Sequence, residues 1–131
     1  MNNPSLADDY RRRARGRRAV VELLINNGLF ADAVREAQEA AELALKSLIR
    51  EAGHPVPFTH EVSKALRAIN DDLPKNVSEQ LDRLCEISKN LRRDRELAFY
   101  GSEDITPSEF YELHHAKTAL SQLDEVLAVL P

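Results

Sequence analysis

Basic and hydroxyl-bearing side chains gather in residues 91–101, which read LRRDRELAFYG. Within this stretch Arg93 and Arg95 precede the phenol of Tyr100. A guanidinium group stays charged at neutral pH and binds planar oxyanions, such as carboxylates and phosphates, through paired hydrogen bonds. Apolar residues flank Arg95, so part of its stem is expected to be covered. Arg95 could form an ion pair within the fold or bind an oxyanion of a ligand, and the sequence does not decide between the two.

The cations around this stretch do not all share one side of a helix. At about 100° per residue, Lys89, Arg92 and Arg93 fall on one helical face. Arg95 lies well round from that face. Arg92 and Arg93 could meet acidic residues of other helices or the negative C-terminal end of their own helix.

The histidines of the sequence do not form a metal-binding pattern. They are His54, His60, His114 and His115. Glu112 and His115 stand at i, i+3, a spacing that di-iron helical bundles use, but such a site needs a matching motif on a facing helix. The sequence has no second motif of this kind. We therefore expect structural or solvent-exposed histidines and no metal site.

The cysteine and glycine patterns exclude other classes of site. Cys85 is the only cysteine and lies on an apolar helical stripe, so we expect a buried, inert thiol and no disulfide. The four glycines are scattered singly. Dinucleotide-binding folds and phosphate-binding loops need glycine-rich turns and are excluded. We expect no cofactor.

A basic block, RRRARGRR, occupies residues 11–18 of a chain with a formal net charge of −4. Its arginines point at many angles around a helix, whereas a stripe that binds nucleic acid would use fewer. A solvated face paired with acidic neighbours is the favoured interpretation. Contact with nucleic acid or a protein partner is the alternative.

Five helical segments must position these residues. Apolar periodicity predicts them over residues 6–26, 30–52, 59–69, 77–100 and 106–130. Side chains that accept hydrogen bonds from the first turn, and glycines that allow a left-handed end, mark their boundaries. The predicted caps are Ser5, Thr59, Asn76 and Thr106, and the predicted stops are Gly28, Gly53 and Gly101.

The predicted fold class is all-α, an antiparallel up-and-down bundle of four to five helices in a single domain over residues 1–131. Short connections between long helices imply antiparallel neighbours. The second segment carries an alanine-rich face that would let another helix approach closely. No apolar run approaches the roughly 18 residues needed to span a bilayer. We expect no membrane association and a cytoplasmic location.

Three stretches of the sequence resemble the HEPN (higher eukaryotes and prokaryotes nucleotide-binding) family. The first is the alanine- and glutamate-rich helix with its proline loop, AVREAQEAAELALKSLIREAGHPVP, over residues 33–57. The second is FTHEV, over residues 58–62, and the third is the arginine-rich stretch over residues 91–101. Their order and spacing carry the resemblance, which extends over about residues 7–130.

The resemblance implies ribonuclease chemistry, but this sequence lacks the histidine of the family's motif. Active HEPN proteins are metal-independent ribonucleases with an Arg-x(4–6)-His motif, two copies of which meet across a homodimer. The arginine steadies phosphate charge and the histidine assists attack by the 2′-hydroxyl. Here Tyr100 stands where the histidine would follow Arg93 or Arg95. A free tyrosine has a pKa of about 10, against about 6.5 for histidine, and is a poor general base.

The resemblance therefore implies a homodimeric nucleotide- or nucleic-acid-phosphate-binding regulatory module that works with a nucleotidyltransferase-type partner. Arg93, Arg95 and Tyr100 would line its groove near the dimer axis, and Tyr100 could be a target of modification by the partner. The alternative is a ribonuclease toxin of a toxin–antitoxin pair, acting on RNA. A third reading is a purely structural helical dimer whose arginines are engaged in ion pairs.

Overall fold

The structure is a computed structural model that describes residues 4–59 and 61–131, with side chains for residues 6–59, 61–93 and 97–131. Throughout these ranges the regular secondary structure is helical and includes no strand. The elements are α1 (Pro4–Asn26), α2 (Phe30–Glu51), α3 (Ser63–Ala68), the 3-10 helix η1 (Asn70–Asp72), α4 (Lys75–Ser78), α5 (Leu81–Tyr100), α6 (Pro107–Phe110) and α7 (Leu113–Leu127).

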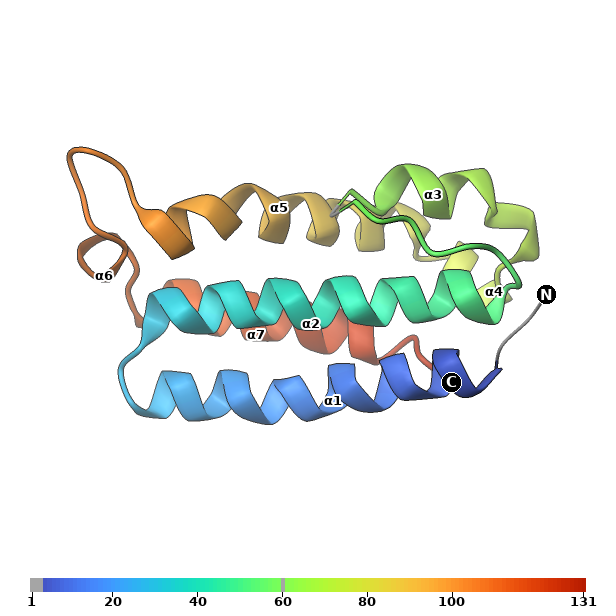
Figure 1. Ribbon diagram of the computed structural model, residues 1–131, viewed down its shortest axis with the longest axis horizontal. Coiled ribbons are helices and arrows are strands. Elements are labelled where there is room, and N and C mark those ends of the chain that lie inside the picture. The colour runs from blue at the N-terminus through green and yellow to red at the C-terminus, as the bar shows by residue number, and fades with distance from the viewer. Residues whose placement is uncertain (1–3, 60) are drawn as a thin grey trace.

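Four long helices, α1, α2, α5 and α7, lie lengthwise beside one another and alternate in direction (Figure 1). The main contacts join α2 to α1, α7 and α5, so α2 is the central helix. The short helices α3 and α4 lie at the end that holds the termini, and α6 lies at the opposite end. The predicted all-α antiparallel bundle is confirmed. No helix in the described part of the chain is long and apolar enough to cross a bilayer.

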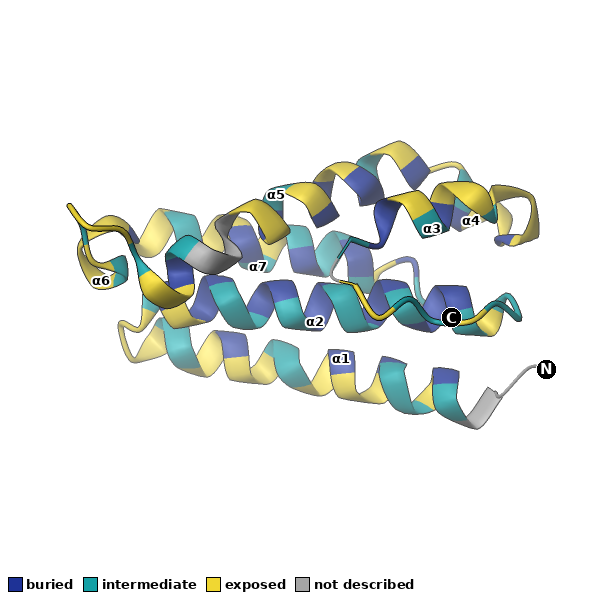
Figure 2. Ribbon diagram, turned by 45° about the horizontal axis from the view of Figure 1, so that its top comes forward, coloured by how far each residue is buried: buried dark blue, intermediate teal, exposed yellow. Residues whose placement is uncertain are grey.

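The alanine-rich face of α2 forms the centre of the core. Ala33, Ala37, Ala40 and Ala44 are completely buried there. Small side chains let α1, α5 and α7 approach the backbone of α2 closely, while Leu45 and other larger residues fill the space between helices. Figure 2 shows the buried residues along α2 and on the inward sides of its neighbours.

Glycines end three of the long segments, as predicted. Gly28, Gly53 and Gly101 all have positive φ values, of 74°, 87° and 76°. The backbone N–H of Gly28 donates to the carbonyl of Ile25 at 3.0 Å, and that of Gly101 donates to the carbonyl of Leu97 at 2.9 Å. Left-handed glycines thereby satisfy carbonyls that the helix ends leave without partners.

Two of the predicted N-terminal caps are wrong for local reasons. Ser5 lies inside α1, because that helix already begins at Pro4, and proline suits the first turn. Thr59 accepts a hydrogen bond from the backbone N–H of Glu61 at 3.0 Å, which closes a turn ahead of the helix. The carboxylate of Glu61 then accepts from the N–H of Ser63, where α3 begins.

The fourth predicted helix is two helices, and its predicted cap is also wrong. α4 follows Pro74 directly, and Gln80 leaves helical geometry before α5 begins at Leu81. The side-chain amide of Asn76 donates to the carbonyl of Val129 at 3.2 Å, so it ties α4 to the C-terminal segment instead of capping a helix. Breaking the helix lets Val77 of the short piece and Leu81 of the long piece both enter the core.

The fifth predicted helix starts as expected but is interrupted after one turn. The hydroxyl of Thr106 accepts from the N–H of Glu109 at 3.2 Å, which confirms Thr106 as a cap. Tyr111 is then extended, with φ −85° and ψ 128°, and its side chain is buried. The interruption turns this ring into the bundle, and α7 begins afresh two residues later.

Cys85 is buried, as predicted. Its thiol donates to the carbonyl of Ser63 at 3.8 Å and fastens α5 to α3. Burial raises the pKa of the Cys85 thiol, because the apolar surroundings disfavour the thiolate. The thiol is therefore a packing group in this fold.

Candidate functional site

A cavity of about 160 Å³ lies between the second half of α5 and the first half of α7. Its lining includes Asn90 and Arg93 of α5, Tyr111 from the junction before α7, and His114, His115 and Gln122 of α7. Val34 of α2 forms part of the wall. The break between α6 and α7 creates this site, because it brings Tyr111 and both imidazoles to the same end of the helix.

His115 is held in place by a reciprocal cap. Its Nδ1 accepts the backbone N–H of Glu112 at 3.0 Å, while the Glu112 side chain accepts from the N–H of His115. A nitrogen that accepts a hydrogen bond carries no hydrogen, so in this geometry the ring N–H lies at Nε2. His115 can therefore offer a fixed N–H donor at its other edge.

Three flat rings surround the ring of His115. The ring of His115 lies 4.0 Å from that of His114 and 5.3 Å from that of Phe110, measured between centroids, and the latter pair is stacked. The Tyr111 ring meets His115 edge-on at 5.4 Å. His114 lines the cavity and is exposed, and Phe110, which stacks on His115, is 39% exposed. Aromatic faces of this kind accept a stacked base, and a nearby guanidinium accepts a phosphate.

The structure separates two of the three predicted site residues. Arg93 lines the cavity, whereas Tyr100 lies two turns further along α5 with 77% of its surface exposed. The Tyr100 ring packs on Phe99 at 4.5 Å, and the guanidinium of Arg35 covers the Phe99 ring at 4.4 Å. The side chain of Arg95 lies outside the described residues.

A sequence profile of the HEPN domain matches residues 7–130, which is nearly the whole chain. The chain belongs to the HEPN domain family. The resemblance predicted from the sequence is thus confirmed, and the helical bundle agrees with it. Comparisons with curated proteins and with solved structures give no match.

In this HEPN domain the imidazoles that line the cavity together with Arg93 come from α7, and the sequence of α5 carries none. Sequence reasoning missed His114, His115 and Tyr111, because it placed one unbroken helix across them. The signal that could have found them is the pairing of Glu112 with His115, which also fits a capping box. The metal alternative for this pair is unsupported, since no group of three or more metal-binding side chains occurs among the described residues.

The neighbouring Arg92 has a structural partner. It donates to the carboxylate of Glu61 at 3.2 Å, which joins α5 to the loop before α3. Sequence reasoning allowed for such a partner from another element. Of the two arginines in this stretch whose side chains the structure describes, Arg93 is the one that lines the cavity.

The basic block of the HEPN domain holds α1 to its neighbours. Arg11 is buried and donates to Glu51 of α2 at 2.9 Å, and Arg17 donates to Glu36 of α2 at 2.7 Å. Arg18 forms a two-pronged pair with Asp124 of α7, and these carboxylate hydrogen bonds raise the pKa of Arg18. The ion-paired face that the sequence favoured is the arrangement found for these arginines.

Proposed function

We propose that this HEPN domain binds the phosphate of a nucleotide or nucleic acid at the cavity between α5 and α7, and acts as a binding or regulatory module. The observation that carries the proposal is the convergence of the Arg93 guanidinium with the rings of Tyr111 and His115 in one hollow. Arg95 and Tyr100, further along α5, would extend the site toward a second subunit.

The size of the cavity indicates which part of a ligand it can hold. Pockets that enclose a whole small molecule measure about 300–1,000 Å³. At about 160 Å³, this one suits a phosphate and part of a sugar. The base would lie outside, on the exposed rings of Phe110 and His114. Stacking tolerates every base, so the site would favour phosphate-linked chains over one particular sequence.

The family implies a homodimer and a nucleotidyltransferase-type partner for such a module. The exposed phenol of Tyr100 supports the second point, because a group that a partner enzyme modifies must be accessible. A modification there would add charge next to Phe99 and close to the proposed dimer axis. The regulatory role would thus consist of changing the charge at the end of α5 through modification of Tyr100.

Fluorescence anisotropy with a labelled single-stranded RNA tests the binding function. We expect Arg93→Gln to weaken binding by about tenfold or more, since a hydrogen bond to a charged group contributes about 1.5–3 kcal/mol. Arg12→Gln is the matched control, because Arg12 is exposed on α1 and its substitution removes the same charge at a position away from the cavity. Equal loss in both variants would reduce the effect to net charge and reject the site.

A metal-independent ribonuclease is the second candidate, and the imidazoles beside Arg93 favour it. His114 would take the proton of a 2′-hydroxyl while that oxygen attacks the phosphorus. The 5′-oxygen would then leave and take up a proton from water, while His114 releases its proton to the solvent, giving a 2′,3′-cyclic phosphate and a 5′-hydroxyl. Arg93 and the N–H of His115 would stabilise the phosphate charge during this step.

The two candidates differ in what happens to RNA and to cells. If the protein is a binding module, RNA incubated with it stays intact on a denaturing gel and its expression leaves growth unchanged. Cleavage to cyclic phosphate ends that His114→Ala and Arg93→Gln both abolish would establish the ribonuclease instead. Growth arrest on expression, relieved by the same substitutions, would identify it as a toxin.

A further inference from the structure

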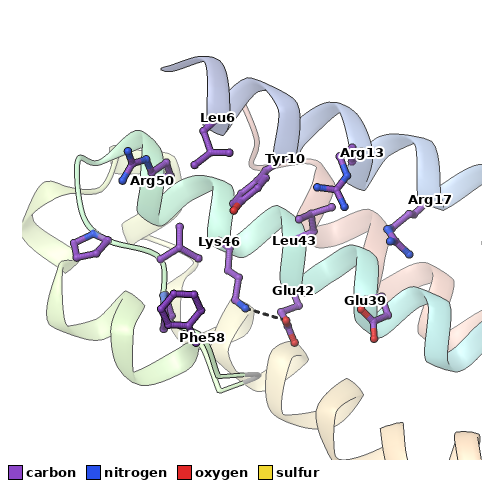
Figure 3. Close-up of a pocket in the computed structure, with 13 residues that line it drawn as sticks. Leu6, Tyr10, Arg13, Arg17, Glu39, Glu42, Leu43, Lys46, Arg50 and Phe58 are labelled. Carbon is purple, nitrogen blue, oxygen red and sulfur yellow. Dashed lines mark hydrogen bonds and ion pairs between the residues drawn. The ribbon is translucent and has the colours of Figure 1, made fainter. Parts of the chain in front are cut away.

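A second and larger hollow, of about 600 Å³, lies between α1, α2 and the loop that follows Gly53 (Figure 3). We call it the Arg50 cleft. No residue that the structure describes lines both this cleft and the Arg93 cavity. Its volume falls within the range of pockets that enclose small organic molecules.

One face of α1 and one face of α2 form the helical walls of the Arg50 cleft. α1 contributes Leu6, Tyr10, Arg13 and Arg17, whose spacing of three or four residues puts them on a single face. Lys46 and Arg50 line the cleft from α2 at the same spacing. In Figure 3 the side chains of α1 extend toward α2, Arg50 lies at the end of α2 beside the loop, and Phe58 lies on that loop near Lys46.

The charge of the Arg50 cleft is opposite to that of the protein as a whole. Among the described residues, four cationic side chains and two carboxylates line it, although the chain has a formal net charge of −4. Two of these cations are engaged: Lys46 pairs with Glu42 at 3.0 Å within the cleft, and Arg17 pairs with Glu36. A local surplus of positive charge in a partly enclosed space concentrates anions.

The other two cations, Arg13 and Arg50, make no hydrogen bond to a carboxylate within the described part of the chain. Arg13 approaches Asp9 only to 3.8 Å, which is longer than a hydrogen bond. The Nε of Arg50 is buried and has no hydrogen-bond partner within the described part of the chain. A buried N–H without an acceptor is rare and costly, and a ligand oxyanion bound by the accessible nitrogens of the same guanidinium would offset part of this cost.

The loop side of the Arg50 cleft is apolar and largely preformed. Phe58 is fully exposed at its rim, and Tyr10 lies on the opposite wall. Pro55 and Pro57 restrict the backbone that carries Phe58, so a ligand would order little additional chain. A flat apolar group between Tyr10 and Phe58 would remove exposed aromatic surface from water.

We infer that the Arg50 cleft binds a small organic anion, composed of a flat apolar or aromatic body and one phosphate, sulfonate or carboxylate group. Arg50 hydrogen-bonds the anionic group, and Arg13 adds to the positive potential around it. The flat body lies between Tyr10 and Phe58. This site is separate from the phosphate site proposed at Arg93, because the described linings of the two have no residue in common.

Titration with the fluorescent aromatic anion anilinonaphthalene sulfonate tests the inference. We expect saturable binding with one probe per chain, weakened about tenfold by Arg50→Gln. Phe58→Ser should also weaken binding, and the native fold should tolerate it because Phe58 is fully exposed. Arg12→Gln, which removes an exposed charge outside the cleft, should bind the probe as the wild type does.

Competition then identifies the anionic group. Displacement of the probe by phenyl phosphate but not by benzoate assigns a phosphate ligand, and the reverse assigns a carboxylate. Phenol, which lacks the anionic group, should not displace the probe. Absence of saturable binding, or binding that both Arg50→Gln and Phe58→Ser leave unchanged, would overturn the inference. Loss of binding in Arg93→Gln alone would place the probe in the other cavity and overturn it equally.

Discussion

Gly101 has less room for a side chain than Gly16 or Gly28. Its φ is 76°, and a Cβ there would lie 2.6 Å from Cδ of Pro107 and 2.9 Å from the carbonyl oxygen of Ile105. Positive φ and a close approach of the backbone both require glycine. The turn that leads from α5 into α6, and so toward the Arg93 cavity, depends on this residue.

We predict that Gly101→Ala lowers the free energy of unfolding by about 1–3 kcal/mol, measured by urea denaturation. Gly16→Ala is the matched control: it lies within α1 with nothing within 4 Å of its Cβ. There alanine should stabilise the helix by about 0.5–1 kcal/mol. A Gly101→Ala protein as stable as the wild type would show that the turn can adopt another conformation.

His115 has a structural role that can be separated from ligand binding. Glutamine at the third position of a helix is an ordinary partner in a capping box, so His115→Gln should keep the stability within about 0.5 kcal/mol. His115→Leu removes the acceptor for the Glu112 N–H and should cost about 1 kcal/mol.

Thermal unfolding and RNA anisotropy together check this pair of variants. Both should weaken RNA binding, because both remove the ring beside Arg93. If His115→Gln bound RNA as tightly as the wild type does, the ring would serve only as a cap.

At the residue scale, the sequence predicted local features better than it predicted which side chains come together. The left-handed glycines, the Thr106 cap and the buried thiol of Cys85 follow from local chemistry, and the structure confirms them. The proximity of Arg93 and His115 could not be predicted in the same way. It depends on how α5 and α7 pack, which no local pattern encodes.

At the scale of elements, α5 and α7 are joined by a two-pronged ion pair. Arg83 donates to both carboxylate oxygens of Glu125, at 2.9 and 2.7 Å. This guanidinium lowers the pKa of the Glu125 carboxyl, since it favours the charged form. The pair links the two helices that enclose the Arg93 cavity, although both side chains remain partly exposed.

We predict that Glu125→Gln is modestly less stable than the wild type at pH 7, measured by the urea midpoint. A carboxyl with a lowered folded pKa contributes stability above its unfolded pKa, near 4.5, and loses it as the pH falls through the lower folded value. The difference between the two proteins should therefore disappear in strong acid.

Glu86→Gln, which breaks only a contact of Arg83 within α5, is the control and should have a smaller effect. A difference that grew as the pH fell would contradict this account of the pair.

The long helices were predictable because their apolar periodicity is continuous and their ends carry glycine. The two interruptions were not, since no glycine or proline marks either position. The break before Leu81 accompanies the bond from Asn76 to Val129, and the break at Tyr111 accompanies burial of its ring. In both places contacts distant in sequence outweigh local helix propensity.

At the scale of the whole molecule, the end of α5 presents an aromatic surface that a monomer would leave in water. Phe99 and Tyr100 are 49% and 77% exposed. Adjacent exposed aromatic rings are typical of the centre of protein interfaces. We propose that this surface forms the homodimer that membership of the HEPN family implies.

Sedimentation velocity tests the proposed dimer. We expect the wild type to sediment as a dimer at micromolar concentration, and Phe99→Ser with Tyr100→Ser to sediment as a monomer with retained helicity. Val20→Ser with Leu23→Ser is the control, because these residues are exposed on α1 and remove similar apolar surface elsewhere. A dimer that survived the α5 substitutions but not the α1 substitutions would move the interface to α1.

The central claim is that phosphate of a nucleic acid binds between α5 and α7. Its most direct test is a nuclear magnetic resonance titration of the isotope-labelled protein with a short single-stranded RNA. The account predicts saturable shifts for the Arg93 guanidinium, the His115 ring and the N–H groups of residues 111–122, with little change along the Arg50 cleft. Shifts confined to α1 and the loop after Gly53, or none at all, would contradict it.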